Sequence, residues 1–455
     1  MSDAAVRARP PLPPGPYAVL GLARSGAAAA AALRARGEQV LGLDTGAAEG
    51  LERLAALGVE LHTGERAREL PERAAALVKS PGVPQHAPAL AAARARGLPV
   101  LGELELGWRL LGNEFIAVTG TNGKTTTAEL IGHVHRQAGL PVVVAGNVGT
   151  ALSSFAGAVD ERATVVCEAS SFQLEDTLAF APEAAVLVNL SADHLDRHGS
   201  LAAYAQAKAN AFARQREQDL AVLPSAVLSD RADELARLLV RAGRARRVGF
   251  GADDGAALRD QGGALHWQGR HLLDAHELRL RGRHNLDNAM AAAAVCLARG
   301  VAEEAVRAGL RSFAGVAHRL ELLACREQVM FVNDSKATNV ASTLVALESF
   351  ADRAGIHLIL GGQGKGQDFA PLRAAVRRRC RAVYLIGEDA EAIGAALRCS
   401  GVALHACGTL ERATAAAAHA ARAGEVVLLS PACASFDQFR DFEARGERFR
   451  ELVCA

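Results

Sequence analysis

A glycine-rich stretch in the first third of the chain has the composition of a phosphate-binding loop. Residues 120–126 read Gly-Thr-Asn-Gly-Lys-Thr-Thr; they follow the apolar run 115–118 and precede a helical pattern over 128–137. A glycine turn between a strand and a helix directs backbone N–H groups and the helix N-terminus at one point, which attracts phosphate. Lys124 adds a cation for the β- and γ-phosphates, and the hydroxyl of either following threonine can ligate Mg²⁺. The pattern predicts a nucleoside triphosphate site.

This loop departs from the general pattern G-x-x-x-x-G-K-[ST] at one position. Val118 stands where the first glycine is expected, so the loop has the compact form Thr-Gly-Thr-Asn-Gly-Lys-Thr. The alternative interpretation is an ordinary glycine turn that carries a solvated lysine. The flanking strand and helix favour the nucleotide site, because a loop of this kind binds phosphate when it connects a strand to the N-terminus of a helix.

Three residues farther along the chain could complete the chemistry at this loop. Glu168 follows the apolar run 165–167, and Mg²⁺ is usually held by one or two carboxylates together with phosphate oxygens and water. His194 lies in a loop after the next strand, and Lys208 lies in an alanine-rich helix predicted over 201–214. Each could equally be an ordinary surface residue. Their joint position near strand ends beside a phosphate loop favours one catalytic edge.

Lysine is rare in this chain, so each lysine position is informative. Only five of the 51 basic residues are lysines: Lys79, Lys124, Lys208, Lys336 and Lys365. An ammonium group is compact and can lose its proton or be modified, whereas a guanidinium group stays charged and forked. These five positions are candidates for roles that arginine cannot fill, with a compositional accident as the alternative.

The elements that position these residues belong to a large α/β protein. A chain of 455 residues predicts about three domains, and a net charge of +1 gives no electrostatic reason to expect nucleic acid or a membrane surface. No apolar run is as long as a membrane span, and the proline-rich N-terminus lacks a signal-peptide core. The eight cysteines show no paired spacing. We expect a cytoplasmic protein with reduced thiols.

We expect three α/β domains in series, in the order Rossmann-like, P-loop ATPase and Rossmann-like, over 1–109, 110–315 and 316–455. The first domain shows a strand, a helix and a second strand that ends at Asp44, as in half of a dinucleotide-binding fold. Ala23 replaces a required glycine of G-x-G-x-x-G, which disfavours a nicotinamide dehydrogenase. A nucleotide-sugar site or a structural role both remain open for this domain.

Several motifs taken together resemble those of the Mur ligases, ATP-dependent amino-acid ligases that build the peptide of the peptidoglycan precursor. The resemblance covers residues 19–452 and rests on the phosphate loop, Asn147, the Asp193–His194 loop with Lys208, and residues 284–288. More specific motifs lie at 170–175, 333–339 and 430–436. They favour the members that join glutamate to UDP-N-acetylmuramoyl-L-alanine.

The resemblance implies a role for each matching position. The implied ATP-binding residues are Gly120, Thr121, Asn122, Gly123, Lys124, Thr125, Thr126, Thr127, Asn285, Asn288, Arg319 and Asp334. Contacts to the UDP substrate are implied for Arg24, Ser25, Asp44, Thr45, Ser80, Pro81, Gly82, Asn147, Ser170 and Gln173. Contacts to glutamate are implied for Lys336, Thr338, Lys365, Ser435, Phe436 and Phe442. The implied catalytic residues are Lys124, Glu168, His194 and Lys208, and the implied ligands of two Mg²⁺ are Thr125, Glu168, His194 and a carbamylated Lys208.

The implied chemistry is phosphorylation of the substrate carboxylate by ATP, followed by attack of the glutamate amine on the acyl phosphate. The resemblance also implies a cytoplasmic monomer without nucleic-acid or membrane partners, which serves cell-wall biogenesis and hence cell shape, division and the cell cycle. Ala169, Ser191, Ala192 and Arg24 depart from the usual family residues, but none of these departures removes a group that the chemistry requires.

Three alternatives stay open at the level of sequence. The acceptor could be L-glutamate instead of D-glutamate, because the motifs do not encode handedness. A folylpolyglutamate-synthase-like ligase would share the loop and metal residues, although a UDP-binding N-terminal domain argues against it. A non-catalytic nucleotide-binding regulator would keep the fold, and the presence of Glu168, His194 and Lys208 argues against that role.

Overall fold

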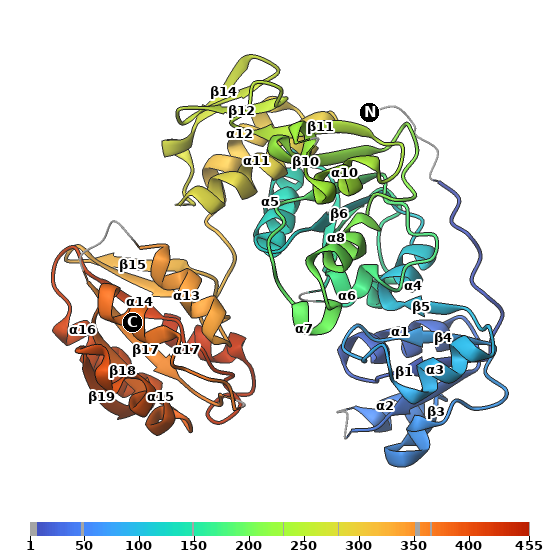
Figure 1. Ribbon diagram of the computed structural model, residues 1–455, viewed down its shortest axis with the longest axis horizontal. Helices are drawn as coiled ribbons and strands as arrows, with labels where there is room; N and C mark the ends of the chain where they lie inside the picture. The colour runs from blue at the N-terminus through green and yellow to red at the C-terminus, as the bar shows by residue number, and fades with distance from the viewer. Residues whose placement is uncertain are drawn as a thin grey trace. The chain divides into compact units, whose positions relative to one another are not determined.

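The computed structural model of the chain describes residues 7–46, 50–147, 150–230, 232–280, 282–350, 355–364 and 366–454. It divides into two compact units, Met1–Phe313 (unit 1) and Ala314–Ala455 (unit 2). Unit 1 holds a five-stranded and a nine-stranded sheet, and unit 2 holds a six-stranded sheet, each with helices packed on it (Figure 1). Three α/β domains in series are confirmed. The boundaries expected after residues 109 and 315 stay predictions.

The five-stranded sheet of unit 1 is parallel, with the order β3-β2-β1-β4-β5. Its strands are β1 (Tyr17–Leu20), β2 (Val40–Asp44), β3 (Glu60–Thr63), β4 (Ala76–Lys79) and β5 (Val100–Gly102). Its helices are α1 (Arg24–Ala35), α2 (Leu51–Ala56), η1 (Gly64–Arg68), α3 (Pro88–Ala95) and α4 (Glu103–Leu110). Strands β1 and β4 are buried along their whole length, as expected for a parallel sheet covered on both faces. The strand order reverses between β1 and β4, which is where such sheets bind ligands.

The nine-stranded sheet has the order β14-β13-β12-β11-β10-β9-β6-β8-β7. It is built from β6 (Phe115–Thr119), β7 (Val142–Gly146), β8 (Thr164–Glu168), β9 (Ala184–Leu187), β10 (Leu220–Pro224), β11 (Arg246–Gly251), β12 (Leu258–Gln261), β13 (Ala264–Trp267) and β14 (Arg270–Asp274). The pairs from β7 to β12 are parallel, and β12, β13 and β14 form an antiparallel meander. The meander has no long apolar run, which is why the sequence did not predict it.

Helices cover this sheet and carry several of the candidate residues. They are α5 (Lys124–Gln137), η2 (Leu152–Phe155), α6 (Ser171–Leu174), α7 (Leu195–His198), α8 (Leu201–Ala209), α9 (Ser225–Ser229), α10 (Glu234–Arg241), η3 (Ala275–Glu277), α11 (Arg283–Ala298) and α12 (Glu303–Ser312). The helix expected over 201–214 is therefore too long. The chain leaves α8 at Asn210, whose side-chain amide donates to the Leu174 carbonyl (3.1 Å), and Phe212 turns into the core.

Unit 2 is one mixed sheet with the order β15-β16-β20-β17-β18-β19. Its strands are β15 (Glu321–Arg326), β16 (Val329–Asn333), β17 (Ile356–Gly361), β18 (Cys380–Ile386), β19 (Ala403–Gly408) and β20 (Val426–Leu429). Its helices are α13 (Val340–Glu348), α14 (Leu372–Arg379), α15 (Ala390–Leu397), η4 (Arg398–Ser400), α16 (Leu410–Ala420) and α17 (Phe442–Cys454). Only β15 is antiparallel to its neighbour. Strands β16 and β20 are parallel neighbours, so the polar residues that follow them meet at one edge of the sheet.

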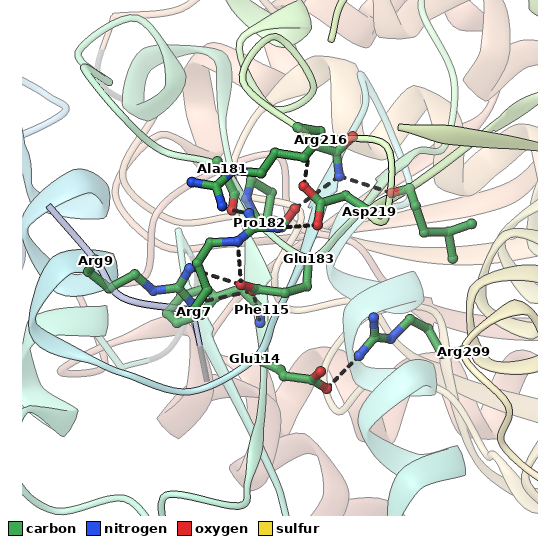
Figure 2. Close-up of polar contacts among 12 residues, drawn as sticks. Arg7, Arg9, Glu114, Phe115, Ala181, Pro182, Glu183, Arg216, Asp219 and Arg299 are labelled. Carbon is green, nitrogen blue, oxygen red and sulfur yellow. Dashed lines mark hydrogen bonds and ion pairs between the residues drawn. The ribbon is translucent and has the colours of Figure 1, made fainter. Parts of the chain in front are cut away.

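An N-terminal arm, residues 7–16, runs along the outside of unit 1 from the nine-stranded to the five-stranded sheet (Figure 1). Figure 2 shows Arg7 and Arg9 directed at Glu183. The Arg9 guanidinium lies 2.9 Å from the Glu183 carboxylate and 4.5 Å from the ring centroid of Trp108, and Glu183 accepts a hydrogen bond from the Phe115 amide (2.9 Å). A cavity of about 450 Å³ beside these groups lies at the amino ends of β6, β9 and β10. It is therefore on the opposite edge of the sheet from the phosphate loop.

None of the helices in the described ranges combines the length and apolar character that a membrane span requires.

Candidate active site

The phosphate loop leaves the carboxyl end of β6 and enters α5. Gly123 has a left-handed conformation (φ 79°), which glycine adopts without a steric penalty. A Cβ atom built on it would lie 2.0 Å from Oδ1 of Asn288, so the loop also needs glycine for space. The Lys124 ammonium group donates to the carbonyl oxygens of Gly120 (3.0 Å) and Thr121 (2.7 Å). It is thereby held over the loop, where a phosphate would be bound.

Polar side chains from neighbouring strands fix the shape of this loop. Oδ1 of Asn189, two residues beyond β9, accepts from the amides of Thr121 (3.1 Å) and Asn122 (2.9 Å). The Tyr204 hydroxyl on α8 donates to the Thr121 hydroxyl (3.4 Å). Sequence reasoning assigned no role to Asn189 or Tyr204. Their contacts with the phosphate loop join residues that are far apart in the sequence and come together only in the folded chain.

Glu168 ends β8, which lies directly beside β6 in the sheet. It is 3 % exposed; its Oε2 accepts from the Thr125 hydroxyl (2.7 Å) and its Oε1 from the Asn147 amide (3.1 Å). Thr126 and Thr127 follow Thr125 in the buried first turn of α5.

The donor set at Glu168 fits Mg²⁺. The Thr125 hydroxyl and the Glu168 carboxylate supply the hard oxygen ligands that this ion prefers. The described residues contain no group of three or more His, Cys, Asp or Glu side chains that could hold a metal. Mg²⁺ usually binds one or two protein carboxylates and completes its shell with phosphate oxygens and water.

Lys208 lies on α8 and is almost completely buried (1 % exposed). Its Nζ donates to the Gly120 carbonyl (2.7 Å) and lies 4.3 Å from the Tyr204 ring centroid. Burial, together with the nearby Lys124 ammonium, lowers the pKa of Lys208 to about 7. A large fraction of these amines is therefore neutral and nucleophilic near neutral pH, which no arginine at this position could be.

His194 lies just before α7 in a left-handed conformation (φ 51°). Its side chain is half-exposed, with Nε2 3.6 Å from Asp193 Oδ2. Its ring centroid lies 4.9 Å from that of Phe172 and 6.5 Å from that of Tyr204. His194 and Lys208 therefore both lie beside the Tyr204 ring, whose hydroxyl bonds to Thr121 of the phosphate loop.

Apart from Asn147, which bonds to Glu168, the residues expected to contact the UDP substrate lie in two groups in unit 1. Asp44 ends β2, and its carboxylate accepts from the Leu22 amide (2.6 Å) and the Gly46 amide (2.8 Å). The Ser80 hydroxyl donates to the Gly21 carbonyl (2.7 Å). These bonds shape the loops after β1, β2 and β4. Thr45, Pro81 and Gly82 lie in these loops, and Arg24 and Ser25 lie in the first turn of α1.

Ser170 and Gln173 form the second group. They make a capping box at the start of α6, in which each side chain bonds to the backbone of the other. Their side chains therefore stabilise the helix that follows Glu168.

Most candidates in unit 2 lie after β16, after β20 or at the start of α17, and Arg319 lies just before β15. Asp334 accepts from the Ser430 hydroxyl (2.8 Å) and the Leu320 amide (3.2 Å), and burial raises its pKa to about 7. Arg319 lies between His318 and Leu320, which both have positive φ angles (61° and 44°). Because the Leu320 amide bonds to Asp334, the neighbouring Arg319 lies close enough for its charge to act on the Asp334 carboxyl group.

Five of the six residues expected around glutamate lie in the turns after β16 and β20 or at the start of α17. The Lys336 ammonium lies 5.7 Å from the Phe442 ring centroid, and Thr338 is half-buried on the same turn. Ser435 is buried, and its hydroxyl has no hydrogen-bond partner among the described residues. Phe436 beside it is 61 % exposed. Lys365 lies outside the described residues.

Arg445 is a further buried cation that sequence reasoning missed. It is 1 % exposed and donates to the Ser335 hydroxyl (3.0 Å) and to the carbonyls of Ser335 (2.9 Å) and Cys433 (3.0 Å). It therefore ties the turn after β16 to the turn after β20. No sequence signal distinguishes it among the many arginines of this chain.

The fold and this edge define an α/β nucleotide-binding protein of the phosphate-loop class. Three family models match the chain: the Mur ligase MurD-like N-terminal domain over 16–102, the Mur ligase middle domain over 118–296, and the Mur ligase glutamate ligase domain over 318–433. The chain belongs to the Mur ligase family, within its MurD-like branch.

Curated relatives match over nearly their full length. A protein named UDP-N-acetylmuramoylalanine–D-glutamate ligase from Chromobacterium violaceum is 44 % identical, over 96 % of this chain and 97 % of the relative. A protein of the same name from Myxococcus xanthus is 42 % identical, over 96 % and 97 %.

Solved structures share the fold at low identity. MurC from Thermotoga maritima, a UDP-N-acetylmuramate-alanine ligase, superimposes with a TM-score of 0.60 at 21 % identity, covering 97 % of this chain and 99 % of that one. Escherichia coli FolC superimposes with a TM-score of 0.54 at 17 % identity, covering 75 % and 89 %.

Proposed function

We propose that this chain is an ATP-dependent, ADP-forming ligase that joins D-glutamate to UDP-N-acetylmuramoyl-L-alanine in peptidoglycan precursor synthesis. The observation that carries the proposal is the 40–44 % identity, over nearly the whole chain, to relatives named for this reaction. Their name specifies D-glutamate and thereby favours it over L-glutamate. FolC shares only the fold at 17 % identity, which gives the folate alternative no comparable support.

The reaction proceeds in two displacements. A carboxylate oxygen of the alanine end attacks the γ-phosphorus of ATP, which forms an acyl phosphate and releases ADP. The amine of glutamate then attacks the acyl carbon, loses a proton and expels phosphate as the amide forms. Catalysis of the first step rests on positioning and charge neutralisation. The loop residues 120–127 and the Lys124 ammonium supply the contacts to the transferred phosphate.

We assign the Mg²⁺ sites to side chains at the carboxyl edge of the nine-stranded sheet. Thr125 and Glu168 would hold one ion and His194 a second, and when bound the ions neutralise phosphate charge. Lys208 would contribute to the second site as a carbamate, formed when its neutral amine attacks carbon dioxide and loses a proton. The burial of Lys208 and its pKa of about 7 support this modification, which turns a cation into an anionic oxygen ligand.

The substrates are assigned to the remaining groups. The loops after β1, β2 and β4, with Asn147, would bind the UDP sugar; Asn285 and Asn288 of α11 would contact adenosine, with Arg319 and Asp334 toward phosphate and ribose. Lys336, Lys365, Thr338, Ser435, Phe436 and Phe442 would form the glutamate pocket, where lysines suit a dicarboxylate. We further propose domains over 1–109, 110–315 and 316–455, and a cytoplasmic monomer that supports cell shape and division through the cell wall.

The test is phosphate release from ATP by the purified chain. Release should require both UDP-N-acetylmuramoyl-L-alanine and D-glutamate, and L-glutamate should not replace the D isomer. Equal release without the nucleotide sugar would refute the assignment, and release with a pteroate substrate instead would favour the folate alternative. ATP binding with no turnover under any substrate combination would indicate a regulator.

A further inference from the structure

Lys79 is the lysine to which neither the sequence motifs nor the proposed function assigns a role. It ends β4 in the five-stranded sheet and is completely buried, and its Nζ lies 2.7 Å from Oδ2 of Asp176. Asp176 lies two residues after α6, in the part of unit 1 that holds the nine-stranded sheet, and its side chain is 4 % exposed. The two residues therefore form a buried ion pair between the two halves of unit 1. The Gly102 amide donates to the Asp176 carbonyl (2.9 Å) and adds a second tie at the same point.

Both ends of this ion pair adjoin proposed site residues. Lys79 immediately precedes Ser80, which begins the loop assigned to the UDP substrate. Asp176 ends the segment that starts at Glu168 and includes α6. Gln85 lies just beyond the same substrate loop, and its amide nitrogen donates to Asp176 Oδ1 (3.1 Å) and to Glu175 Oε2 (3.1 Å). Two residues that flank the substrate loop thus hold one short acidic segment.

The contacts continue from this acidic segment to the proposed metal ligand. Glu175 Oε1 lies 2.9 Å from Nδ1 of His198, whose side chain is 1 % exposed. The His198 ring stacks on Phe172 of α6, with centroids 5.5 Å apart. Phe172 in turn contacts His194, with centroids 4.9 Å apart. An unbroken series of contacts therefore joins the substrate loop to His194.

The chemistry of this pair accounts for a lysine in a chain that otherwise uses arginine. Asp176 offers Lys79 one oxygen, because Gln85 occupies the other. A compact ammonium group suits a single acceptor, whereas a guanidinium fork is matched to two. Removing either charge leaves its partner buried without compensation, which destabilises a protein far more than the loss of a surface ion pair.

We propose that Lys79 and Asp176 are positioning residues of the ligase reaction. The pair fixes the position of the UDP-substrate loop relative to the sheet edge that carries Glu168 and His194. This inference rests on the proposed function for its substrates. If the inference holds, removing the Lys79–Asp176 ion pair lowers kcat by more than the loss of folded protein explains. Misplacing a bound carboxylate by about 1 Å relative to the γ-phosphate can lower a rate about 100-fold.

The experiment compares Lys79→Met, the double variant Lys79→Met/Asp176→Leu and a matched control, Arg9→Met. Arg9 also forms an interior ion pair in unit 1, to Glu183 on the opposite edge of the sheet. The measurements are kcat, the KM values for the UDP substrate and ATP, and the thermal midpoint. Lys79→Met should lower kcat about 10- to 100-fold with the KM for ATP within about twofold. The double variant should recover the midpoint, because an apolar pair needs no charge compensation, while kcat stays low.

Arg9→Met should lower the midpoint and leave kcat unchanged. A kcat for Lys79→Met within about twofold of the wild type would overturn the proposal, as would recovery of kcat together with the midpoint in the double variant. If Lys79→Met does not fold, the double variant alone decides between these results.

Hydrogen exchange without ligands keeps the failure of this inference distinct from that of the proposed function. Peptides that cover residues 168–176 and 194–198 should exchange faster in Lys79→Met and in the double variant, and at the wild-type rate in Arg9→Met. Unchanged exchange would overturn the positioning role. A wild-type chain that lacks ligase activity but shows the faster exchange in the variants would refute only the proposed function.

Discussion

Replacing Gly123 with alanine tests the steric reasoning about the phosphate loop. Gly123 has a φ of 79°, and alanine in this left-handed region is disfavoured by about 1–2 kcal/mol. The new Cβ would also lie 2.0 Å from Oδ1 and 2.8 Å from Cγ of Asn288. Asn288 is 3 % exposed on α11, so either its side chain or the loop must move. Overpacking of this kind adds about 1–3 kcal/mol, which brings the expected loss to about 2–5 kcal/mol.

Gly139→Ala is the matched control. Gly139 follows the same helix α5 with a φ of 67°, and a Cβ there would meet no atom within 4 Å. The Gly139→Ala variant should lose only the free energy of unfolding that the left-handed backbone costs, about 1–2 kcal/mol. ATP affinity should fall in Gly123→Ala and stay at the wild-type value in Gly139→Ala, because only the first change displaces the loop amides and Asn288.

Urea unfolding followed by tryptophan fluorescence measures the stability of the correct unit, since Trp108 and Trp267 both lie in unit 1. Calorimetric titration with ATP measures the affinity. Equal losses of unfolding free energy in the two variants, or unchanged ATP affinity in Gly123→Ala, would refute the reasoning. Either result would mean that the Asn288 side chain moves away at little energetic cost and does not restrict the conformation of the loop.

Three further predictions follow from the charged groups of the site. Both Lys208→Arg and Lys208→Ala should lower phosphate release at least about 100-fold with ATP still bound, because neither side chain can form a carbamate; wild-type turnover in either variant would contradict the carbamate. Glu168→Gln should raise the Mg²⁺ concentration for half-maximal phosphate release, because it removes a charged ligand, and an unchanged Mg²⁺ titration would count against this assignment. Asp334 has a pKa of about 7 in the folded chain, above its ordinary value of 3.8. Between these two values the folded chain keeps a proton on Asp334 that the unfolded chain has lost. The contribution of Asp334 to the free energy of unfolding therefore falls as pH rises from about 4 to 7. Asp334→Asn should flatten that part of the stability–pH profile in calorimetry, and an unaltered slope would show that another group is responsible.

Local sequence was enough to predict the elements around the phosphate loop. The apolar run 115–118 and the glycine turn correspond to β6 and the loop, although α5 begins at Lys124, before the expected helix over 128–137. The difference arises because Lys124 and the three threonines after it form the first turn of the helix. The antiparallel meander β12–β14 was missed, because residues such as Arg259 and Gln261 leave it without the apolar run that predicts a buried strand.

The candidate site was predictable only in part. Glu168 at the end of β8 and Asp334 directly after β16 could each be expected at the carboxyl edge of its own sheet, since parallel strands place their carboxyl ends together. Asn189 and Arg445 were not predictable, because their roles consist of contacts to loops that are distant in sequence. Ser170 and Gln173 bond to each other at the start of α6, a local arrangement that the substrate assignment alone would not suggest.

By itself the sequence determined the phosphate loop, the rarity of lysine and the strand ends, because these depend on residue type and on neighbours within a few positions. Tertiary structure decided which lysines meet which partners. Lys79 pairs with Asp176, 97 residues away, and Lys208 donates to the Gly120 carbonyl, 88 residues away. It also decided that the pKa of Lys208 falls to about 7. Burial and the nearby Lys124 cause that shift, and both exist only after the chain has folded.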